Sequence, residues 1–157
     1  YNILGDLDIA YKEYKHEPFF TCEQADKLYK KLEGGHSKNL FLRNRKGDIH
    51  YLVVLESHKR LDLRNFGAQI GETKLGLGSP ERLMRHLGVT PGSVSPFALI
   101  NNEDHDVKVY IDNDLLKHDM LHYHPNINTA TLGVLKDDFV KFLEWTGNEV
   151  NYIDISA

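Results

Sequence analysis

The segment 88–96 has the composition of a loop that could hold a reacting group. Its sequence is Gly-Val-Thr-Pro-Gly-Ser-Val-Ser-Pro, which brings two glycines and two prolines close together. Proline stiffens the backbone, and glycine lets it approach a ligand closely. Backbone N–H groups presented in this way can hold a carbonyl group or an oxyanion. The segment therefore suits a substrate with a carbonyl group, and a rigid connector is the alternative.

A lysine and a group of histidines are the other side chains that could carry chemistry. Lys38 precedes Asn39 at the start of an otherwise apolar run, where it can face a cleft and meet a phosphate or a carboxylate. His118, His122 and His124 are close in the sequence, but no further Cys or His cluster accompanies them, so we expect no metal site. The sequence contains no P-loop, GxGxxG, HExxH or GxSxG motif.

The distribution of charge is uneven along the chain. The net charge of −4 argues against a nucleic-acid partner. Residues 27–64, however, contain 10 Lys and Arg against 4 Asp and Glu, whereas residues 101–157 contain 4 against 11. The first segment could offer a basic face to phosphates. Ordinary solvated surface explains the same counts, and charge alone favours that interpretation.

Size and composition indicate an ordinary globular protein. The 157 residues are 41% hydrophobic and 27% charged, and Cys22 is the single cysteine. We expect one domain over residues 1–157, no transmembrane segment or signal peptide, and a reducing, cytoplasmic location.

Short helices and strands alternate irregularly, which predicts a mixed α/β (α+β) domain. Capping residues and apolar spacing predict helices over 21–32, 62–69, 79–88 and 136–145. Apolar runs predict strands over 39–44, 49–55, 97–101, 107–111, 121–124, 130–134 and 150–155. The turn between the first two strands predicts a hairpin.

Five segments, in this order and spacing, resemble the YbaK/ProX superfamily, which includes the editing domain of bacterial prolyl-tRNA synthetases. The resemblance is greatest to the free-standing ProX-type deacylases and runs from about Pro18 to Ile155. The segments are Lys38-Asn-Leu-Phe-Leu-Arg-Asn44, Lys46-Gly-Asp-Ile-His-Tyr-Leu52, Ser79-Pro-Glu-Arg-Leu83, Gly88-Val-Thr-Pro-Gly-Ser-Val-Ser-Pro-Phe97 and His124-Pro-Asn-Ile-Asn128-Thr-Ala-Thr131.

The resemblance implies a fold and a set of site residues. The implied fold has a central, mostly antiparallel sheet flanked by helices. Lys38 matches the family's active-site lysine, and Asn39 follows it as a supporting residue. The remaining matches are the Gly-x-x-x-Pro loop and the histidine of a His-Pro motif: Gly92, Ser93, Val94, Ser95, Pro96 and His124. From the basic segment, we expect Arg43 and Arg45 to meet acceptor-stem phosphates.

The implied activity is hydrolysis of mischarged tRNA(Pro), with alanine as the first choice of amino acid. The ester is already activated and the adjacent ribose hydroxyl can direct water, so neither a cofactor nor a catalytic triad is needed. The backbone amides of the loop would then orient the ester carbonyl. Because the serine side chains would not take part, alanine at Ser93 or at Ser95 should leave activity within about tenfold. A serine nucleophile is the rival mechanism.

The partners implied are the tRNA(Pro) acceptor end and, as an open expectation, prolyl-tRNA synthetase, with no membrane. A cysteinyl-tRNA(Pro) deacylase is an alternative function on the same scaffold. A non-catalytic module that captures aminoacyl-tRNA ends or a small ligand is a second alternative.

Overall fold

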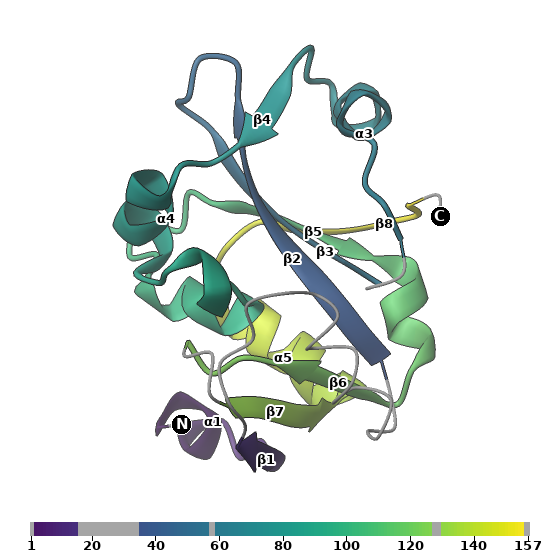
Figure 1. The fold of residues 1–157 in the computed structure, drawn as a ribbon. Helices are drawn as coiled ribbons and strands as arrows, with labels where there is room; N and C mark the ends of the chain where they lie inside the picture. The colour runs from purple at the N-terminus through teal and green to yellow at the C-terminus, as the bar shows by residue number, and fades with distance from the viewer. Residues whose placement is uncertain (1, 16–34, 57–58, 127–129, 156–157) are drawn as a thin grey trace.

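The computed structural model describes residues 2–15, 35–56, 59–126 and 130–155 (Figure 1). The α-helices are α1 (Asn2–Asp6), α3 (Leu63–Ile70), α4 (Pro80–Leu87) and α5 (Lys136–Thr146). The 3-10 helices are η1 (Pro91–Ser93), η2 (Pro96–Asn101) and η3 (Asn113–Lys117). The strands are β1 (Tyr11–Lys15), β2 (Gly35–Asn44), β3 (His50–Glu56), β4 (Leu75–Leu77), β5 (Lys108–Asp112), β6 (Met120–Tyr123), β7 (Ala130–Leu135) and β8 (Val150–Ile153).

The strands form one sheet in the order β1-β7-β6-β2-β3-β5-β8, with β4 also paired to β2. The pairs β1–β7, β6–β7, β2–β3 and β2–β4 are antiparallel. The pairs β2–β6, β3–β5 and β5–β8 are parallel. The structure thus confirms a mixed α/β domain whose sheet is mostly antiparallel, and it confirms the β2–β3 hairpin.

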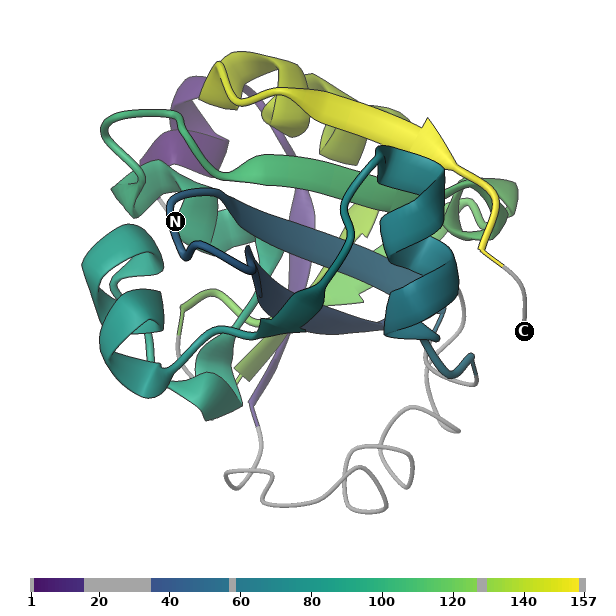
Figure 2. The ribbon, with the colours of Figure 1, turned by 90° about the horizontal axis from the view of Figure 1, so that it is seen from above.

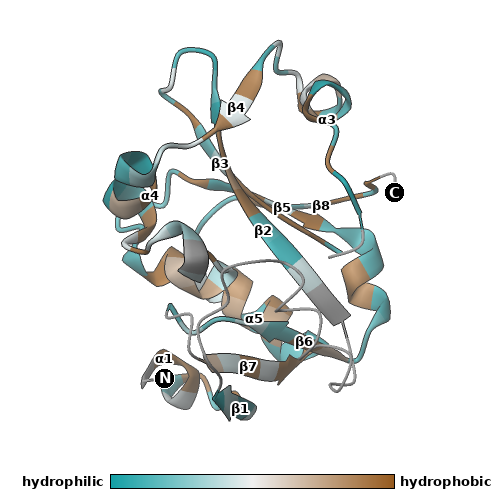
Figure 3. Ribbon diagram, in the orientation of Figure 1, coloured by the Kyte–Doolittle hydropathy of each residue, from teal (hydrophilic) through white to brown (hydrophobic). Residues whose placement is uncertain are grey.

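Two apolar cores lie on opposite faces of the sheet. The first packs α4, α5 and η2 against the sheet and includes Leu87, Phe97, Phe142 and Leu52. The second lies under α3 and includes Phe66, and Figure 2 shows α3 across that face. Strand β3 is buried on both faces. Its continuous apolar run, which Figure 3 shows in brown, suits this central position. Among the described helices, none is long and apolar enough to cross a membrane.

Helix ends follow their capping residues closely. Asp62 caps α3 by accepting hydrogen bonds from the backbone of Arg64 and Asn65. Ser79 caps α4, and the left-handed Gly147 ends α5. These local signals depend on neighbouring residues only, and the predictions made from them are confirmed.

The apolar run 97–101 does not form the predicted strand. It belongs to the 3-10 helix η2, in which Pro96 occupies the first turn and Ser95 Oγ accepts the Phe97 N–H at 3.1 Å. The fixed φ of proline and this cap favour a helical start, so the prediction of a strand was wrong. The predicted helix 21–32 lies outside the described residues. Elements α1, β1, β4, η1 and η3 were not predicted.

A cluster of rings at the hairpin holds His50 in its neutral form. The ring of His50 stacks on Phe41 at a centroid distance of 5.3 Å and lies 4.1 Å from the ring of His86. Its Nε2 is 3.2 Å from Arg82 Nη1. Because arginine can only donate, this nitrogen must accept the hydrogen bond. Burial, together with His86 and Arg82, lowers the pKa of His50 to about 4.

The free energy of unfolding should therefore fall as the pH falls from about 6.5 to about 4. An unfolded His50 takes up its proton near its ordinary pKa of about 6.5, whereas the folded ring resists protonation until about 4. The unfolded chain binds more protons in this window, so acid favours unfolding, by up to about 3 kcal/mol. Urea unfolding at about pH 7.5 and about pH 4.5 measures the effect.

His50→Gln is the control for this titration. Glutamine keeps an acceptor for Arg82 but does not titrate, so the variant should lose less stability over the same pH interval. Equal losses in both proteins would assign the acid sensitivity to other groups.

Candidate active site

Strand β2 carries the two polar residues of the Lys-Asn pair on opposite faces of the sheet. Lys38 is paired with Leu55, and Asn39 with Val54. Leu55 belongs to the core under α3 and Val54 to the core under α4 and α5. Since directly opposed side chains share a face, Lys38 lies on the α3 side and Asn39 on the other side.

Asn39 joins β2 to the Gly-x-x-x-Pro loop. Its Nδ2 donates to the carbonyl oxygen of Val94 at 3.1 Å. Its Oδ1 is buried and has no hydrogen-bond partner among the described residues. The side-chain amide of Asn39 thus fixes the loop through Nδ2, while its Oδ1 remains available to accept a hydrogen bond.

The same loop is bonded to the residue of the His-Pro motif. Ser95 is fully buried, and its Oγ donates to the carbonyl oxygen of His124 at 2.6 Å. The His124 ring lies with Nδ1 2.9 Å from the carbonyl oxygen of Ala130. Because this oxygen can only accept a hydrogen bond, the Nδ1 atom of His124 carries a proton. Asn39, the loop and His124 therefore form one bonded unit.

Lys38 is not part of this unit. Its side chain is half-buried and forms no hydrogen bond or ion pair with the residues that the structure describes. It lies near the start of β2, only three residues from Gly35, so a ligand that reaches around this end of the strand could meet both faces. The assignment of Lys38 to the site remains a prediction.

The two serines of the loop differ in their surroundings. Ser93 is buried at 5% exposure, but its hydroxyl makes no hydrogen bond within the described ranges. Ser95 Oγ bonds both the His124 carbonyl and the Phe97 N–H. The expectation that alanine is tolerated at both positions is therefore kept for Ser93 and revised for Ser95.

Ser95→Ala should destabilise the protein by about 2 kcal/mol and lower kcat/KM by at least about tenfold, because it leaves the His124 carbonyl oxygen and the buried Phe97 N–H without the hydroxyl that bonds them. Ser93→Ala removes a hydroxyl of the same kind without breaking a bond, and should change both quantities little. Urea unfolding and single-turnover deacylation of both variants measure the difference. Similar behaviour of the two variants would contradict the positioning role of Ser95.

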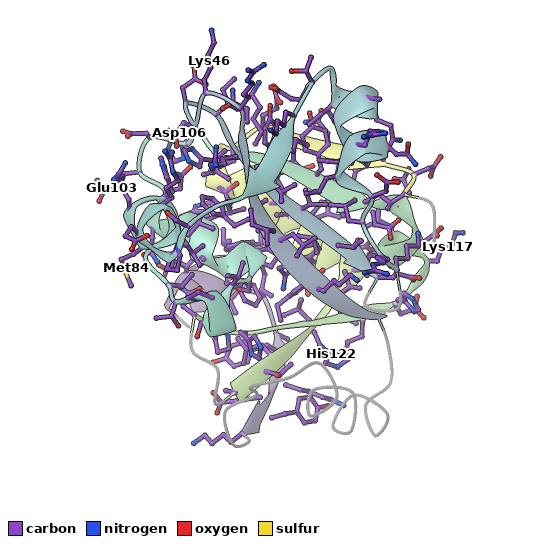
Figure 4. All side chains as sticks on the ribbon, turned by 45° about the horizontal axis from the view of Figure 1, so that its top comes forward. Lys46, Met84, Glu103, Asp106, Lys117 and His122 are labelled. Atoms are coloured by element: carbon purple, nitrogen blue, oxygen red, sulfur yellow. The ribbon has the colours of Figure 1, made fainter. Side chains whose placement is uncertain are left out.

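The three clustered histidines do not converge. His118 Nε2 lies 2.8 Å from Glu56 Oε1, whereas the His124 ring faces the carbonyl oxygen of Ala130. His122 is buried on β6, at 2% exposure (Figure 4). In the described part of the chain, no group of three or more His, Cys, Asp or Glu residues could hold a metal ion. Their closeness in sequence does not translate into a ligand set.

A small cavity lies beside the His-Pro motif. Its volume is about 30 Å³, and its lining is formed by Ile3, Leu4, Phe97, Ile100, Pro125, Asn126, Leu132 and Phe142. Asn126 has a φ of 65°, and its buried Oδ1 has no partner among the described residues. Sequence reasoning did not select Asn126, although asparagine is one of the few residues that adopt a left-handed backbone readily.

Arg43 and Arg45 lie at the other end of β2 from Lys38. Arg43 is paired with Gly76 of β4, and Arg45 begins the hairpin turn. They do not contact the bonded unit of Asn39, the loop and His124, and they would meet a different part of a long ligand.

Comparison with known proteins identifies the family. Residues 16–142 match the family model of the aminoacyl-tRNA editing domain. Prolyl-tRNA editing protein ProX of Acetoanaerobium sticklandii is 37% identical over 152 residues, which covers 97% of this chain and 93% of that protein. Prolyl-tRNA synthetase associated domain-containing protein 1 of Mus musculus is 32% identical over 150 residues, covering 93% and 88%.

Solved structures share the fold. The crystal structure of a hypothetical protein superimposes with a TM-score of 0.75 at 20% identity, covering 99% of this chain and 97% of that chain. A candidate trans-editing enzyme for prolyl tRNA synthetase gives 0.70 at 22% identity, covering 94% and 87%.

The chain belongs to the aminoacyl-tRNA editing domain family. Its predicted fold and its predicted enzyme class, an aminoacyl-tRNA deacylase, are thereby confirmed.

Proposed function

We propose that this deacylase acts in trans on mischarged tRNA(Pro) and that its substrate is alanyl-tRNA(Pro). Similarity to the prolyl-tRNA editing protein ProX over nearly the whole of both proteins supports editing of tRNA(Pro). The acceptor end of the tRNA is the partner that this function requires. Prolyl-tRNA synthetase, which would produce the mischarged tRNA, is a second expected partner.

Two backbone amides in the loop carry the mechanistic part of the proposal. The Ser93 N–H donates to the Thr90 carbonyl oxygen at 2.9 Å. Within the residues that the structure describes, the N–H groups of Val94 and Ser95 donate to no backbone carbonyl. Adjacent donors held in a stiff loop beside His124 suit an ester carbonyl, on which negative charge develops during hydrolysis.

In this mechanism the protein positions the ester and the ribose hydroxyl beside it directs the water. No nucleophile from the protein is needed, and Ser95 is a poor candidate because its hydroxyl already bonds the His124 carbonyl. Lys38 would hold a phosphate or the backbone at the acceptor end, and the His124 side chain would shape the pocket. Binding and orientation then supply most of the rate enhancement.

The choice of alanine is supported by the small cavity beside Pro125 and Asn126. Its volume of about 30 Å³ admits a methyl-sized group, since one water needs about 10–15 Å³ by the same measure. A proline ring would not fit, so correctly charged tRNA would be spared.

The test is deacylation of alanyl-, cysteinyl-, seryl- and prolyl-tRNA(Pro) by the purified protein, with and without a chelator. We expect alanyl-tRNA(Pro) to have the highest kcat/KM, prolyl-tRNA(Pro) to be spared, and the chelator to have no effect. Faster hydrolysis of the cysteinyl ester would replace alanine by cysteine as the substrate. Binding of all four without hydrolysis would indicate a non-catalytic module.

A further inference from the structure

A basic pocket lies where β4 joins the β2–β3 hairpin, away from the loop and His124. It is lined by Arg43, Asn44, Arg45, Lys74, Leu75 and Gly76 and has a volume of about 150 Å³. Figure 1 shows β4 beside the hairpin, at the opposite end of the molecule from β1. The space is several times that needed for one water molecule. It can hold a small hydrated group.

Arg43 in the pocket shares one face of the sheet with Asn39. Arg43 is paired with Gly76, and Asn44 with Leu75. Leu75 belongs to the core under α3, so its partner Asn44 also faces that core. Because side chains alternate along a strand, Arg43 lies on the opposite face, which is the face of Asn39. Arg45 and Lys74 directly adjoin the paired residues Asn44 and Leu75, and both line the pocket.

Positive charge in the pocket is not neutralised by the pocket's own residues. No carboxylate lines it, and in the described chain no ion pair involves Arg43, Arg45 or Lys74. The carboxylate nearest to Lys74 in sequence, Glu72, accepts a hydrogen bond from Tyr51 Oη at 2.6 Å. Tyr51 belongs to the core under α3, so this carboxylate serves the opposite face.

The hairpin turn that carries Arg45 is rigidly braced. Asn44 Oδ1 accepts the N–H groups of Gly47 at 2.8 Å and Asp48 at 3.1 Å. Arg82 of α4 donates to the Gly47 carbonyl oxygen at 2.7 Å. Lys46 points away from the molecule at this tip (Figure 4). Bracing lowers the ordering cost of binding at the pocket.

We infer that the basic pocket binds a backbone phosphate of the tRNA, at a fixed distance from the ester. This inference rests on the proposed function, because that function makes tRNA the ligand. Arg43 lies four residues beyond Asn39 on β2, a distance of about 13 Å along the strand. A stacked nucleic-acid strand covers that distance with about four nucleotides. The pocket thus holds the phosphate about four nucleotides from the aminoacylated end of the tRNA. Lys74, which lies outside the basic segment 27–64, also lines this pocket.

Two variants test the pocket by different routes. Lys74→Gln removes a charge from an exposed side chain. Gly76→Val fills the space without removing charge, and a Cβ at Gly76 would meet no atom within 4 Å, so the fold should tolerate it. Lys12→Gln, on the edge strand β1, is the matched control for loss of one surface charge.

Binding of uncharged, fluorescently labelled tRNA(Pro) is measured by anisotropy over a range of salt concentrations. Lys74→Gln should raise Kd about tenfold and flatten the salt slope by about 1. Gly76→Val should raise Kd similarly, and Lys12→Gln should leave Kd and slope unchanged. Unchanged binding in both pocket variants, or an equal loss in Lys12→Gln, would overturn the inference.

Deacylation separates this inference from the proposed function. The pocket variants should raise KM for aminoacyl-tRNA but not for the same amino acid esterified to a CCA trinucleotide, which is too short to reach the pocket. Equal losses on both substrates would assign the variants' effect to the catalytic end and overturn the inference. A wild-type protein that binds tRNA through the pocket but hydrolyses neither substrate would remove the proposed function alone.

Discussion

Lys38→Ala is expected to lower kcat/KM for deacylation by at least about 100-fold, because Lys38 would hold a phosphate or the backbone of the acceptor end, and a displacement of the ester by about 1 Å costs about that much. The side chain is half-buried and has no partner among the described residues, so the free energy of unfolding should change by less than about 0.5 kcal/mol. Single-turnover deacylation and urea unfolding measure the two quantities.

The control for Lys38 is its neighbour on the other face of β2. Asn39→Ala breaks the bond to the Val94 carbonyl oxygen and should affect the loop, whereas Lys38→Ala should leave loop geometry intact. A large loss with Lys38→Ala would mean that the substrate reaches around the start of β2 to contact both faces. A folded Lys38→Ala protein with near-normal turnover would remove Lys38 from the mechanism.

Lys59→Met is expected to destabilise the protein by about 3–5 kcal/mol, because it leaves a buried carboxylate without its cation. Lys59 is 3% exposed and its Nζ bonds Asp112 at 2.9 Å, Asp114 at 2.6 Å and the Ile155 carbonyl oxygen at 2.7 Å. Burial opposes the charge on Lys59, but the hydrogen bonds that it donates to Asp114 and Asp112 raise its pKa. Urea unfolding measures the loss.

Lys117 provides a matched control for this prediction. It also bonds Asp114, at 2.7 Å, but its side chain is 77% exposed. Lys117→Ala should therefore cost less than about 1 kcal/mol. If Lys59→Met does not fold, the double variant Lys59→Met/Asp112→Leu should recover part of the loss, since no buried charge is then left unpaired. Equal losses for Lys59→Met and Lys117→Ala would contradict the account.

Features that depend on local sequence could be predicted well. Asp62, Ser79 and Gly147 each act on a few neighbouring residues, and the helix ends follow them. Strand β4 could not be predicted, because three residues carry too weak a pattern and their pairing with β2 depends on distant chain segments. The apolar run 97–101 was misread because burial in a 3-10 helix leaves the same composition as burial in a strand.

The candidate site likewise has parts that could be predicted from the sequence and parts that depend on distant segments of the chain. The resemblance selected the loop and His124, and the structure brings both together with Asn39 through the bonds of Val94 and Ser95. The opposite facing of Lys38 follows from strand alternation and could have been read from the sequence once the core face was known. The role of Ser95 could not, because its partner lies 29 residues away in the chain.

The buried charge cluster around Lys59 has a consequence for synthesis of the protein. The Ile155 carbonyl oxygen that completes it is 96 residues further along the chain. Strand β8, which pairs in parallel with β5, is made after the other described strands. Until Ile155 has been added to the chain, the ammonium group of Lys59 lacks this carbonyl acceptor, and the sheet lacks its β8 edge. The domain can therefore reach its full stability only after residue 155 has emerged from the ribosomal tunnel.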